Sequence, residues 1–359
     1  MNNRVYIIAE AGVNHNGFLD KALELVDVAA KAGADAIKFQ TFKTDSFVSR
    51  SAPKAEYQKK TTSRAESQYD MIKKLELGEE DHLRLTSHCN SVGIDFLSTP
   101  FDIESLDFLV TKLALPKIKL PSGEITNGPL LLKAAQSGKT IVLSTGMSTL
   151  GEIEIALGIL AFGYLKSNTP PSLRSFQEAY GSEIGQSFLK ERVTLLHCTT
   201  EYPAPFQDVN LRAMETLRHV FGLSVGYSDH TEGIIIPVAA VASGATIIEK
   251  HVTLDRNLPG PDHKASLEPD DLERMVKAIR EVELAIGSPI KHPVPSELKN
   301  ILIARKSLVA SRTIRKGERF TSENLAIKRP GGGISPLYYW DWLGRVSDRD
   351  YQLDEQVKF

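Results

Sequence analysis

The sequence has few cysteines and no apolar run long enough to cross a membrane. Cys89 and Cys198 are its two cysteines, far apart and in no CxxC spacing, so we expect no structural disulfide and a reduced compartment. The first residues, MNNRVYIIAEAG, lack the long apolar region and the cleavage site of a signal peptide. These absences predict a cytoplasmic protein with no membrane partner.

A dominant charge of either sign is also lacking. The 43 basic and 45 acidic residues leave a formal net charge of −2, so no global basic field favours nucleic acid or an anionic membrane as a partner. The composition, 42% hydrophobic and 25% charged, is ordinary for a globular enzyme with a sizeable core. At 359 residues we expect one large domain with an appendage, or two domains.

Short apolar runs alternate with longer helical patterns through the first 287 residues. Amphipathic stretches such as Leu19–Ala32 and Pro269–Ile286 are predicted helices. Eight strand–helix units in this length match a (β/α)8 (TIM) barrel of the α/β class. A doubly wound open sheet is the alternative, but no G-x-G-x-x-G follows the first strand. The eight predicted strands are 5–9, 36–39, 94–97, 117–120, 140–143, 193–196, 223–227 and 246–249.

The alternation predicts a barrel domain over 1–287 and then stops. Segment 288–304 begins SPIKHPVP and is predicted to be a linker, and 305–359 reads as a small second domain of short strands and turns. Two connections, 41–79 and 163–192, are unusually long for a barrel. Long βα loops commonly build the substrate site, and flexible excursions are the alternative.

Every predicted strand ends in polar or ionisable side chains. The carboxyl ends of the strands carry the catalytic residues of a (β/α)8 barrel, so this pattern predicts an active site there. In chain order these residues are Glu10; Lys38 and Gln40; Ser98 and Thr99; Lys119, Ser122 and Glu124; Ser144 and Thr145; His197, Thr199 and Thr200; Ser228, Asp229 and His230; and Glu249, Lys250 and His251.

Histidines close the last two strands, in VGYSDHTEG and TIIEKHVTL. His230 and His251 are expected at matching heights on neighbouring strands, where they could share a metal ion and leave positions open for substrate and water. Taken singly, each could instead be a satisfied polar group at a strand end. Two imidazoles without thiolates favour a catalytic divalent ion, Mn²⁺ first and Mg²⁺ or Co²⁺ as alternatives, over structural zinc.

Two lysines, Lys38 and Lys119, lie inside apolar strands, where an unpaired ammonium is costly. The lysines and the nearby hydroxyls suggest a site for a compact polyanion such as a phosphate-carboxylate, and a Schiff-base lysine is the alternative. Glu10 and Glu124 could bind sugar hydroxyls or move protons, or could form salt bridges to the lysines. The hydroxyls are those of Thr99, Ser122, Ser144 and Ser228.

Ten motifs occur in order along essentially the whole chain: IIAEAGVNHNG, KFQTFKTD, LSTPFD, KLPSGEITN, STGM, LHCTTEYPAPFQDVNL, GYSDHTEG, EKHVTLD, GPDHKAS and KRPGGGIS. Together they resemble the sialic acid synthase family, the bacterial nonulosonate synthases. The resemblance implies a barrel followed by a small antifreeze-like (SAF) domain, in a domain-swapped homodimer. It also implies condensation of phosphoenolpyruvate with a 2-acetamido-mannose-type aldose and water, which releases phosphate and a nine-carbon 2-keto acid.

The resemblance also assigns roles to individual residues. It implies that Arg329 reaches the sugar's N-acetyl group from the partner subunit's small domain, and that His230 and His251 hold the metal. The residues implied to bind phosphoenolpyruvate are Lys38, Thr99, Lys119, Ser122, Ser144 and Ser228. The residues implied to contact the sugar are Glu10, Gln40, Glu124, Tyr202 and Asp262. The candidate catalytic residues are Glu10, Lys38, Lys119 and Glu124.

Three positions of the signature fit less simply. Some relatives have Asn where this chain has Thr200, which weakens the case for Thr200 in anion binding. Asn14 and His15, in NHNG, shape a loop at least as readily as they take part in catalysis.

The choice of aldose depends on what contacts C4 to C6, which we expect from the 41–79 loop and the region of Tyr202. AEAGVNHNG and LHCTTEYPAPF are more similar to the members that make N,N′-diacetyllegionaminate, whose aldose is 2,4-diacetamido-2,4,6-trideoxymannose. The loop is also close to that of N-acetylneuraminate synthases, which take N-acetylmannosamine, and Tyr57, Gln58 and Tyr69 fit either. A pocket for a 4-acetamido, 6-methyl sugar should be more apolar, and we favour that sugar.

Two other classes of function remain open at this point. A barrel that has lost activity could bind carbohydrate through its small second domain, although the intact set of strand-end residues argues against this. A metal-dependent aldolase would use pyruvate and release no phosphate.

Overall fold

The computed structural model describes residues 4–62, 66–166 and 168–358, without the side chains of Tyr57, Lys60 and Thr61. The chain divides into two compact units, Met1–Gly287 and Ser288–Phe359, and each has its own hydrophobic core. No helix in the described ranges is both long enough and apolar enough to span a membrane.

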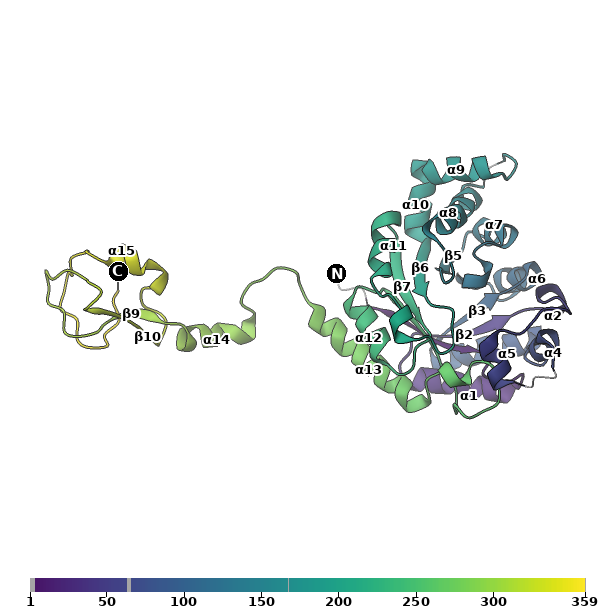
Figure 1. Ribbon diagram of the computed structural model, residues 1–359, viewed down its shortest axis with the longest axis horizontal. Helices are drawn as coiled ribbons and strands as arrows, with labels where there is room; N and C mark the ends of the chain where they lie inside the picture. Colours follow the sequence, from purple (N-terminus) through teal and green to yellow (C-terminus); the bar gives the residue numbers. More distant parts are fainter. Residues whose placement is uncertain (1–3, 63–65, 167, 359) are drawn as a thin grey trace. The chain divides into compact units, whose positions relative to one another are not determined.

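The first unit is a (β/α)8 barrel, in which helices surround eight parallel strands (Figure 1). Neighbouring strands are hydrogen-bonded in the order β3-β2-β1-β8-β7-β6-β5-β4, and β3 and β4 lie in contact at the remaining position. The predicted barrel is therefore confirmed. The strands are β1 (Tyr6–Gly12), β2 (Ala36–Thr41), β3 (Asp95–Pro100), β4 (Lys117–Leu120), β5 (Thr140–Ser144), β6 (Val193–Cys198), β7 (Ser224–Asp229) and β8 (Ile247–His251).

Most strands run further than their apolar residues suggest. β1 continues past Ala9 to Gly12, and β8 continues past Glu249 to His251. Parallel pairing holds these ends, because Glu10 is in register with Lys38 on β2 and with His251 on β8. The polar side chains are thus carried on paired backbone, which fixes their directions into or out of the barrel.

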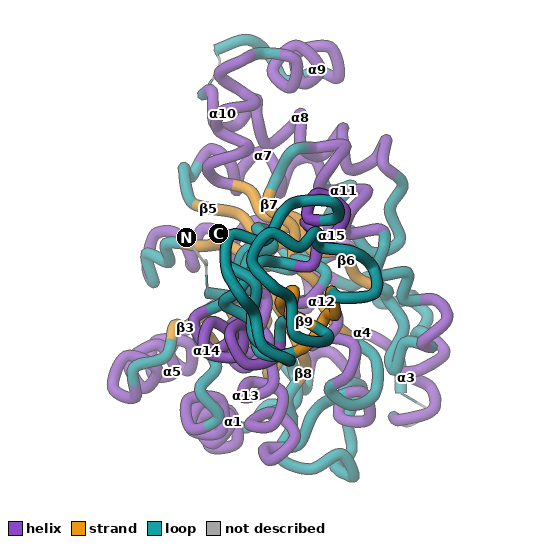
Figure 2. Tube along the Cα trace, turned by 90° about the vertical axis from the view of Figure 1, so that its left-hand side faces the viewer, coloured by secondary structure: helices purple, strands orange, loops and turns teal. Residues whose placement is uncertain are grey.

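The helices that follow the strands bury their apolar faces on the outside of the barrel, as Ala22, Leu25 and Val26 of the first helix do. The predicted helix Pro269–Ile286 has those bounds in the structure. Figure 2 shows these helices outside the orange strands. They are α1 (Leu19–Lys31), α5 (Glu79–Val92), α6 (Ile103–Asp107) with the π-helix η1 (Phe108–Lys112), α7 (Gly128–Gln136), α8 (Leu150–Leu165), α11 (Ala213–Phe221), α12 (Ile235–Ala242) and α13 (Pro269–Ile286). Short 3₁₀ helices lie in the loops after β4, β6 and β8: η2 (Ser122–Glu124), η3 (Phe206–Asp208) and η4 (His263–Ala265). A further one, η5 (Pro336–Tyr338), belongs to the second unit.

The two long connections contain helices of their own. The 41–79 connection forms α2 (Thr44–Phe47), α3 (Glu56–Thr61) and α4 (Gln68–Lys73). The 163–192 connection forms α9 (Leu173–Gly181) and α10 (Glu183–Arg192), which pack on α8, with the rings of Phe162 and Phe176 5.3 Å apart. Among their described residues, those of the first connection line the cavity at the strand ends and those of the second do not, so the expectation that long connections build the site holds for the first alone within this part of the chain. The helices of the second connection extend the outer layer of the barrel.

The second unit consists mostly of loops (teal in the foreground of Figure 2) around a small core. Its regular elements are α14 (Pro295–Ala304), the antiparallel strands β9 (Ser307–Ala310) and β10 (Leu325–Lys328), and α15 (Tyr339–Trp342). The predicted linker 288–304 is therefore helical in its second half. Pro295 takes the first turn of α14, where proline is favoured, and the helix is held to the unit because Gly331 N donates to Leu302 O at 2.7 Å.

Gly226 tests the packing of the barrel, because it lies in β7 where no side chain fits. A Cβ atom there would lie 2.5 Å from Ile247 O and 2.7 Å from Leu196 Cδ2. We expect Gly226→Ala to lower the free energy of unfolding by about 1–3 kcal/mol, measured by urea denaturation. Gly181→Ala is the matched control, since a Cβ at Gly181 meets nothing within 4 Å. It should be neutral or stabilising by up to about 1 kcal/mol, and equal midpoints for the two variants would contradict the packing.

Candidate active site

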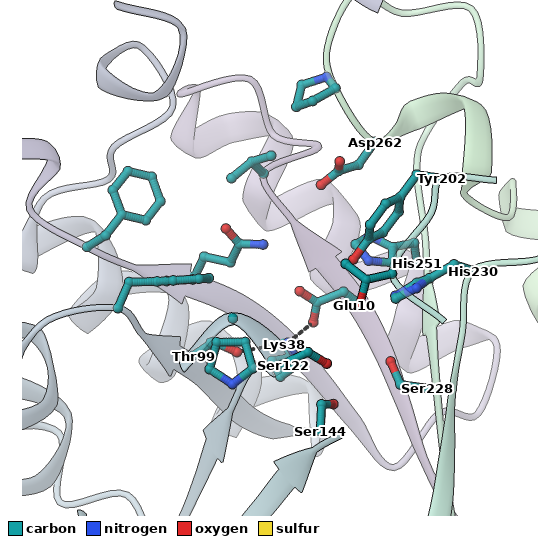
Figure 3. Close-up of a pocket in the computed structure, with 18 of the residues that line it drawn as sticks. Glu10, Lys38, Thr99, Ser122, Ser144, Tyr202, Ser228, His230, His251 and Asp262 are labelled. Atoms are coloured by element: carbon teal, nitrogen blue, oxygen red, sulfur yellow. Dashed lines mark hydrogen bonds and ion pairs between the residues drawn. The ribbon is translucent and has the colours of Figure 1, made fainter. Parts of the chain in front are cut away.

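A cavity of about 270 Å³ lies at the carboxyl ends of the strands. Figure 3 labels ten of the residues that line it, with Glu10, Lys38 and Thr99 on strands and Asp262 and Tyr202 on loops above them. The structure brings together here most of the residues predicted for the site. Those that line the cavity are Glu10, Lys38, Gln40, Thr99, Lys119, Ser122, Ser144, Tyr202, Ser228, His230, His251 and Asp262.

The two lysines are buried and share two carboxylates. Lys38 Nζ lies 2.5 Å from Glu10 Oε2 and 2.9 Å from Thr99 Oγ1. Glu249 lies between the lysines, with Oε2 3.7 Å from Lys38 Nζ and Oε1 3.5 Å from Lys119 Nζ. All four ionisable side chains are at most 6% exposed. Two positive and two negative charges thus balance at the base of the cavity, which offsets the cost of burying each of them.

Burial and these ion pairs set the pKa values of the four groups. Burial alone raises the pKa of Glu249, but Lys119 and Lys38 outweigh it and lower that pKa to about 2. Burial raises the pKa of Glu10 to about 7, although Lys38 opposes the rise. Burial lowers the pKa of Lys119, whereas Glu10 and Glu249 overcome burial and raise the pKa of Lys38. Glu249 is therefore the permanent counter-ion of the site, and Glu10 is the carboxyl that gains a proton more readily.

Hydroxyl groups surround the two lysines. Lys119 Nζ donates to Ser144 Oγ at 2.8 Å, and Ser228 Oγ donates to Glu249 Oε1 at 2.8 Å. Ser122 Oγ, at the start of η2, accepts from Gly146 N at 2.9 Å. These hydroxyl groups are on short side chains at or next to the ends of strands, and hydroxyl groups of this kind can donate to phosphate and carboxylate oxygens.

Gly146 leaves room for three polar side chains to meet. A Cβ atom at Gly146 would lie 2.4 Å from Thr200 Oγ1, 2.7 Å from Cys198 Sγ and 2.8 Å from Ser122 Oγ. Thr200 Oγ1 is buried without a hydrogen-bond partner among the described residues. The structure thus places Thr200 at the cavity with an unused hydroxyl, which leaves its share in anion binding a prediction.

His230 and His251 face each other across the barrel mouth, with ring centroids 5.4 Å apart. His230 Nδ1 lies 2.6 Å from Thr199 O, and since a carbonyl can only accept, this nitrogen carries the proton and Nε2 keeps its lone pair. His251 Nδ1 is buried with no hydrogen-bond partner in the described part of the chain. Burial lowers the pKa of His230 to about 4 and that of His251 well below its usual range. Both rings are therefore neutral, the form that binds a metal.

This donor set fits a catalytic ion. No group of three or more His, Cys, Asp and Glu side chains able to hold a metal occurs among the described residues. The protein would supply the two imidazoles, and the remaining coordination positions would be left to substrate and water. The ring of Tyr202 packs 4.1 Å from that of His230 and restricts its orientation.

The predicted sugar-binding residues are distributed unevenly. Asp262 is 7% exposed, and its carboxylate receives no hydrogen bond from another described residue. Burial raises the pKa of Asp262 to about 6. Glu124 is on η2 but does not line the cavity, and its Oε2 accepts from Asn127 Nδ2 at 2.6 Å. Among the described residues it forms no salt bridge to the lysines, which was the alternative role for this residue, whereas Glu10 does. Arg329 belongs to the second unit, where its Nε donates to Ala304 O at 3.0 Å.

Sequence reasoning missed one buried ion pair that supports the histidines. Lys250 Nζ donates to Asp229 Oδ2 at 2.6 Å and also to Thr231 O, and both ionic side chains are 0% exposed. Asp229 Oδ1 accepts from Tyr227 OH at 3.0 Å. The ionisable neighbours of His230 and His251 thus tie the ends of β7 and β8 together and are not extra metal ligands. The sequence contains a signal for this pair: an acidic residue, Asp229, directly precedes His230 in SDH, and a basic residue, Lys250, directly precedes His251 in EKH.

The NHNG turn has a structural role. Asn14 Nδ2 donates to Val252 O and to Ser266 Oγ, each at 2.8 Å, and this joins the loop after β1 to the loop after β8. His15 Nδ1 accepts from Gly17 N at 3.0 Å. Both residues shape the loop, in agreement with the interpretation of the sequence.

The loop residues considered for the aldose also differ in place. Gln58 lines the cavity, whereas Tyr69 does not, and Tyr69 OH donates to Asp45 Oδ1 at 2.5 Å. The side chain of Tyr57 lies outside the described residues.

Comparison with known proteins gives a consistent result. The chain matches the NeuB family over residues 25–291 and the SAF domain over residues 305–358. An N,N′-diacetyllegionaminic acid synthase from Campylobacter jejuni is 50% identical over 355 residues, which is 99% of each chain. A protein of the same name from Legionella pneumophila is 46% identical and covers 92% of this chain and 87% of its own.

Solved structures agree with this assignment. The N-acetylneuraminic acid (sialic acid) synthetase of Leptospira borgpetersenii superposes with a TM-score of 0.67 at 35% identity, over 84% of this chain and 91% of that one. The expected barrel, SAF domain and family are therefore confirmed. The chain belongs to the NeuB family of sialic acid synthases, is an enzyme, and carries a SAF domain after its barrel.

Proposed function

We propose that this enzyme condenses phosphoenolpyruvate with 2,4-diacetamido-2,4,6-trideoxymannose and water, and releases phosphate and N,N′-diacetyllegionaminate. The observation that carries the proposal is one cavity in which two buried lysines lie beside two neutral histidines. The lysines suit a phosphate-carboxylate, and the histidines suit the carbonyl end of an aldose. Identity of 50% to the Campylobacter jejuni synthase supports the choice of sugar.

The proposed reaction forms one C–C bond and breaks one C–O bond. C3 of phosphoenolpyruvate attacks the aldehyde carbon, and positive charge develops at C2. Water adds to C2 and loses a proton, and the tetrahedral intermediate then expels phosphate with its bridging oxygen. Lys38 and Lys119 neutralise the phosphate as it leaves, in a buried site where fixed charges act strongly.

The aldehyde oxygen gains a proton during this step, and Glu10 is placed to supply it. Its carboxyl is in register with His251 on one side and Lys38 on the other. A group with a pKa of about 7 exchanges protons readily near neutral pH. Glu124 is assigned a lesser role, because it lies outside the cavity lining.

We also propose that His230 and His251 hold a divalent ion, Mn²⁺ first and Mg²⁺ or Co²⁺ as alternatives. When bound, such an ion polarises a carbonyl oxygen as a Lewis acid. A Schiff base at Lys38 is less suitable, because it needs a neutral lysine and the carboxylates favour protonated Lys38. At Lys119, whose pKa is lowered by burial, the release of phosphate in the kinetic test below distinguishes the two mechanisms.

Assembly and location stay predictions. In the predicted domain-swapped homodimer, Arg329 of one subunit reaches the sugar in the cavity of the other. The apolar residues Leu298, Leu302 and Ile303 on α14 are each more than half exposed within this chain, which supports a partner that covers them. A cytoplasmic location suits a reaction that consumes phosphoenolpyruvate.

The reaction and the aldose are tested together by kinetics. With phosphoenolpyruvate saturating, kcat/KM for 2,4-diacetamido-2,4,6-trideoxymannose should exceed that for N-acetylmannosamine by at least about tenfold, measured by phosphate release. In ¹⁸O-water the label should enter the C2 oxygen of the keto acid and not the phosphate. A preference for N-acetylmannosamine would overturn the aldose alone. Turnover of pyruvate without phosphate release would overturn the reaction and favour an aldolase.

The metal is tested by removal and by direct binding. Chelator-treated enzyme should lose activity and regain it with Mn²⁺, and titration should find one Mn²⁺ per chain by electron paramagnetic resonance. His251→Ala should bind no Mn²⁺ in this titration and stay inactive when Mn²⁺ is added, because a single imidazole is left to hold the ion. His219→Ala is the control, since His219 is exposed on α11. This variant should bind Mn²⁺ as the parent enzyme does. Full activity in excess chelator would refute the metal.

Asp262 should cost stability at high pH. Burial raises its pKa in the folded protein from the usual 3.8 to about 6, so the folded state loses stability as pH rises between these values. The free energy of unfolding, measured by urea denaturation, should therefore be about 2–3 kcal/mol higher for Asp262→Asn than for the parent at pH 8. Near pH 4 the two values should differ little. The KM for the aldose should rise at least about tenfold while the KM for phosphoenolpyruvate changes little. Equal stability of the two proteins at pH 8 would contradict the buried charge.

A further inference from the structure

The cavity is polar at the strand ends. One layer above them, on one side, most lining residues are apolar, and Gln58 on α3 and Gln68 on α4 are the polar ones. β1, β2 and β3 are neighbours, and they end at Gly12, Thr41 and Pro100. The next residue after each of these ends is apolar and lines the cavity: Val13, Phe42 and Phe101. The layer below holds Glu10, Lys38 and Thr99 on the same three strands.

The helices of the 41–79 connection extend this surface. Phe47 at the end of α2 and Met71 and Ile72 on α4 also line the cavity. The ring centroids of Phe47 and Phe101 are 4.5 Å apart, and those of Phe42 and Phe101 are 6.2 Å apart. We call this surface, made by Val13, Phe42, Phe47, Met71, Ile72 and Phe101, the apolar wall.

The wall differs from an ordinary loop core in one respect. Val13, Phe42 and Met71 are at most 6% exposed, as core residues are. Phe47, Ile72 and Phe101 are only partly buried, and the surface that they leave uncovered faces the cavity. None of the six side chains can donate or accept a strong hydrogen bond.

The direction of a bound aldose follows from the polar groups. Its aldehyde carbon must lie near His230 and His251, and the phosphoenolpyruvate near Lys38 and Lys119 below. Figure 3 shows Tyr202 and Asp262 on the same side of the cavity as the histidines, where they can meet sugar hydroxyl and acetamido groups. The far end of the sugar is left to the side of β1 to β3, where the apolar wall stands.

We propose that the apolar wall receives the C6 methyl group of a 6-deoxy aldose and rejects aldoses with a 6-hydroxyl. This inference rests on the proposed function and names the group of the substrate that the 41–79 connection reads. A methyl group gains apolar contact there, whereas a hydroxyl loses water and finds no partner among the six side chains. The wall therefore sets the choice among nonulosonate precursors, and the lysines and histidines do not.

The test compares two aldoses that differ only at C6. They are 2,4-diacetamido-2,4,6-trideoxymannose and 2,4-diacetamido-2,4-dideoxymannose. With phosphoenolpyruvate saturating, the parent enzyme should favour the 6-deoxy sugar in kcat/KM by about tenfold or more. The ratio is independent of the fraction of enzyme that is folded, because both sugars are measured on one preparation.

Two variants place a hydroxyl in the wall, Ile72→Thr and Phe101→Tyr. Each should lower the preference for the 6-deoxy sugar by about fivefold or more, and the KM for phosphoenolpyruvate should not change. Ile103→Thr is the matched control, because Ile103 is 41% exposed, begins α6 after the same strand as Phe101 and does not line the cavity. Its preference should equal that of the parent.

An unchanged ratio in both wall variants would overturn the inference and leave the proposed function standing. If neither variant folds, Ile72→Val decides: it removes one methyl group and should reduce kcat/KM for the 6-deoxy sugar more than for the 6-hydroxy sugar. An equal reduction for the two sugars would overturn the inference as well. If the parent enzyme releases no phosphate with any aldose, the proposed function fails first and the inference fails with it.

Discussion

The site depends on the neutralisation of two lysines buried in a barrel. An unpaired ammonium at this depth would cost several kcal/mol, and Glu249 removes that cost for both lysines at once. The arrangement requires that β2, β4 and β8 keep their relative heights, because they carry Lys38, Lys119 and Glu249. The pairing of β1 with both β2 and β8, and the Lys250–Asp229 pair between β7 and β8, supply this constraint. The ion pairs of the site therefore depend on the strand register of the barrel.

Much of the site follows from the sequence, because a strand end in a barrel has a known place. Lys38, Ser144 and His251 were found from their positions alone, since parallel strands of similar height bring such residues together. Tyr202 and Asp262 lie on loops, where no period marks them, and only the family motifs pointed to them. Glu124 does not line the cavity, since it is on η2 and its carboxylate accepts from Asn127, and its part in the reaction stays a prediction.

Other features depend on contacts that sequence patterns do not contain. Glu249 is one more polar residue at a strand end until the structure places it between two lysines. Phe47 and Ile72 look like the apolar side of short helices, and their exposure to the cavity depends on how α2 and α4 fold back over the barrel. Segment 288–304 was taken for a linker because of its prolines, yet Pro295 starts a helix. The predicted strands also end a few residues too soon. Polar residues such as Glu10 resemble loop residues in the sequence, although their backbone is paired in the sheet.

The 41–79 connection leaves the barrel at the end of β2, where Thr41 pairs with Pro100 of β3, and it leads into α5, which begins at Glu79 in the outer layer of the barrel. Its anchor points are therefore supplied by the barrel and not by its own sequence. A segment held in this way can be exchanged between relatives, or grafted by design, without moving the lysines or the histidines. Substitutions within this one peripheral segment can therefore change the surface that faces the cavity, while the strand ends that carry the lysines and histidines are left as they are.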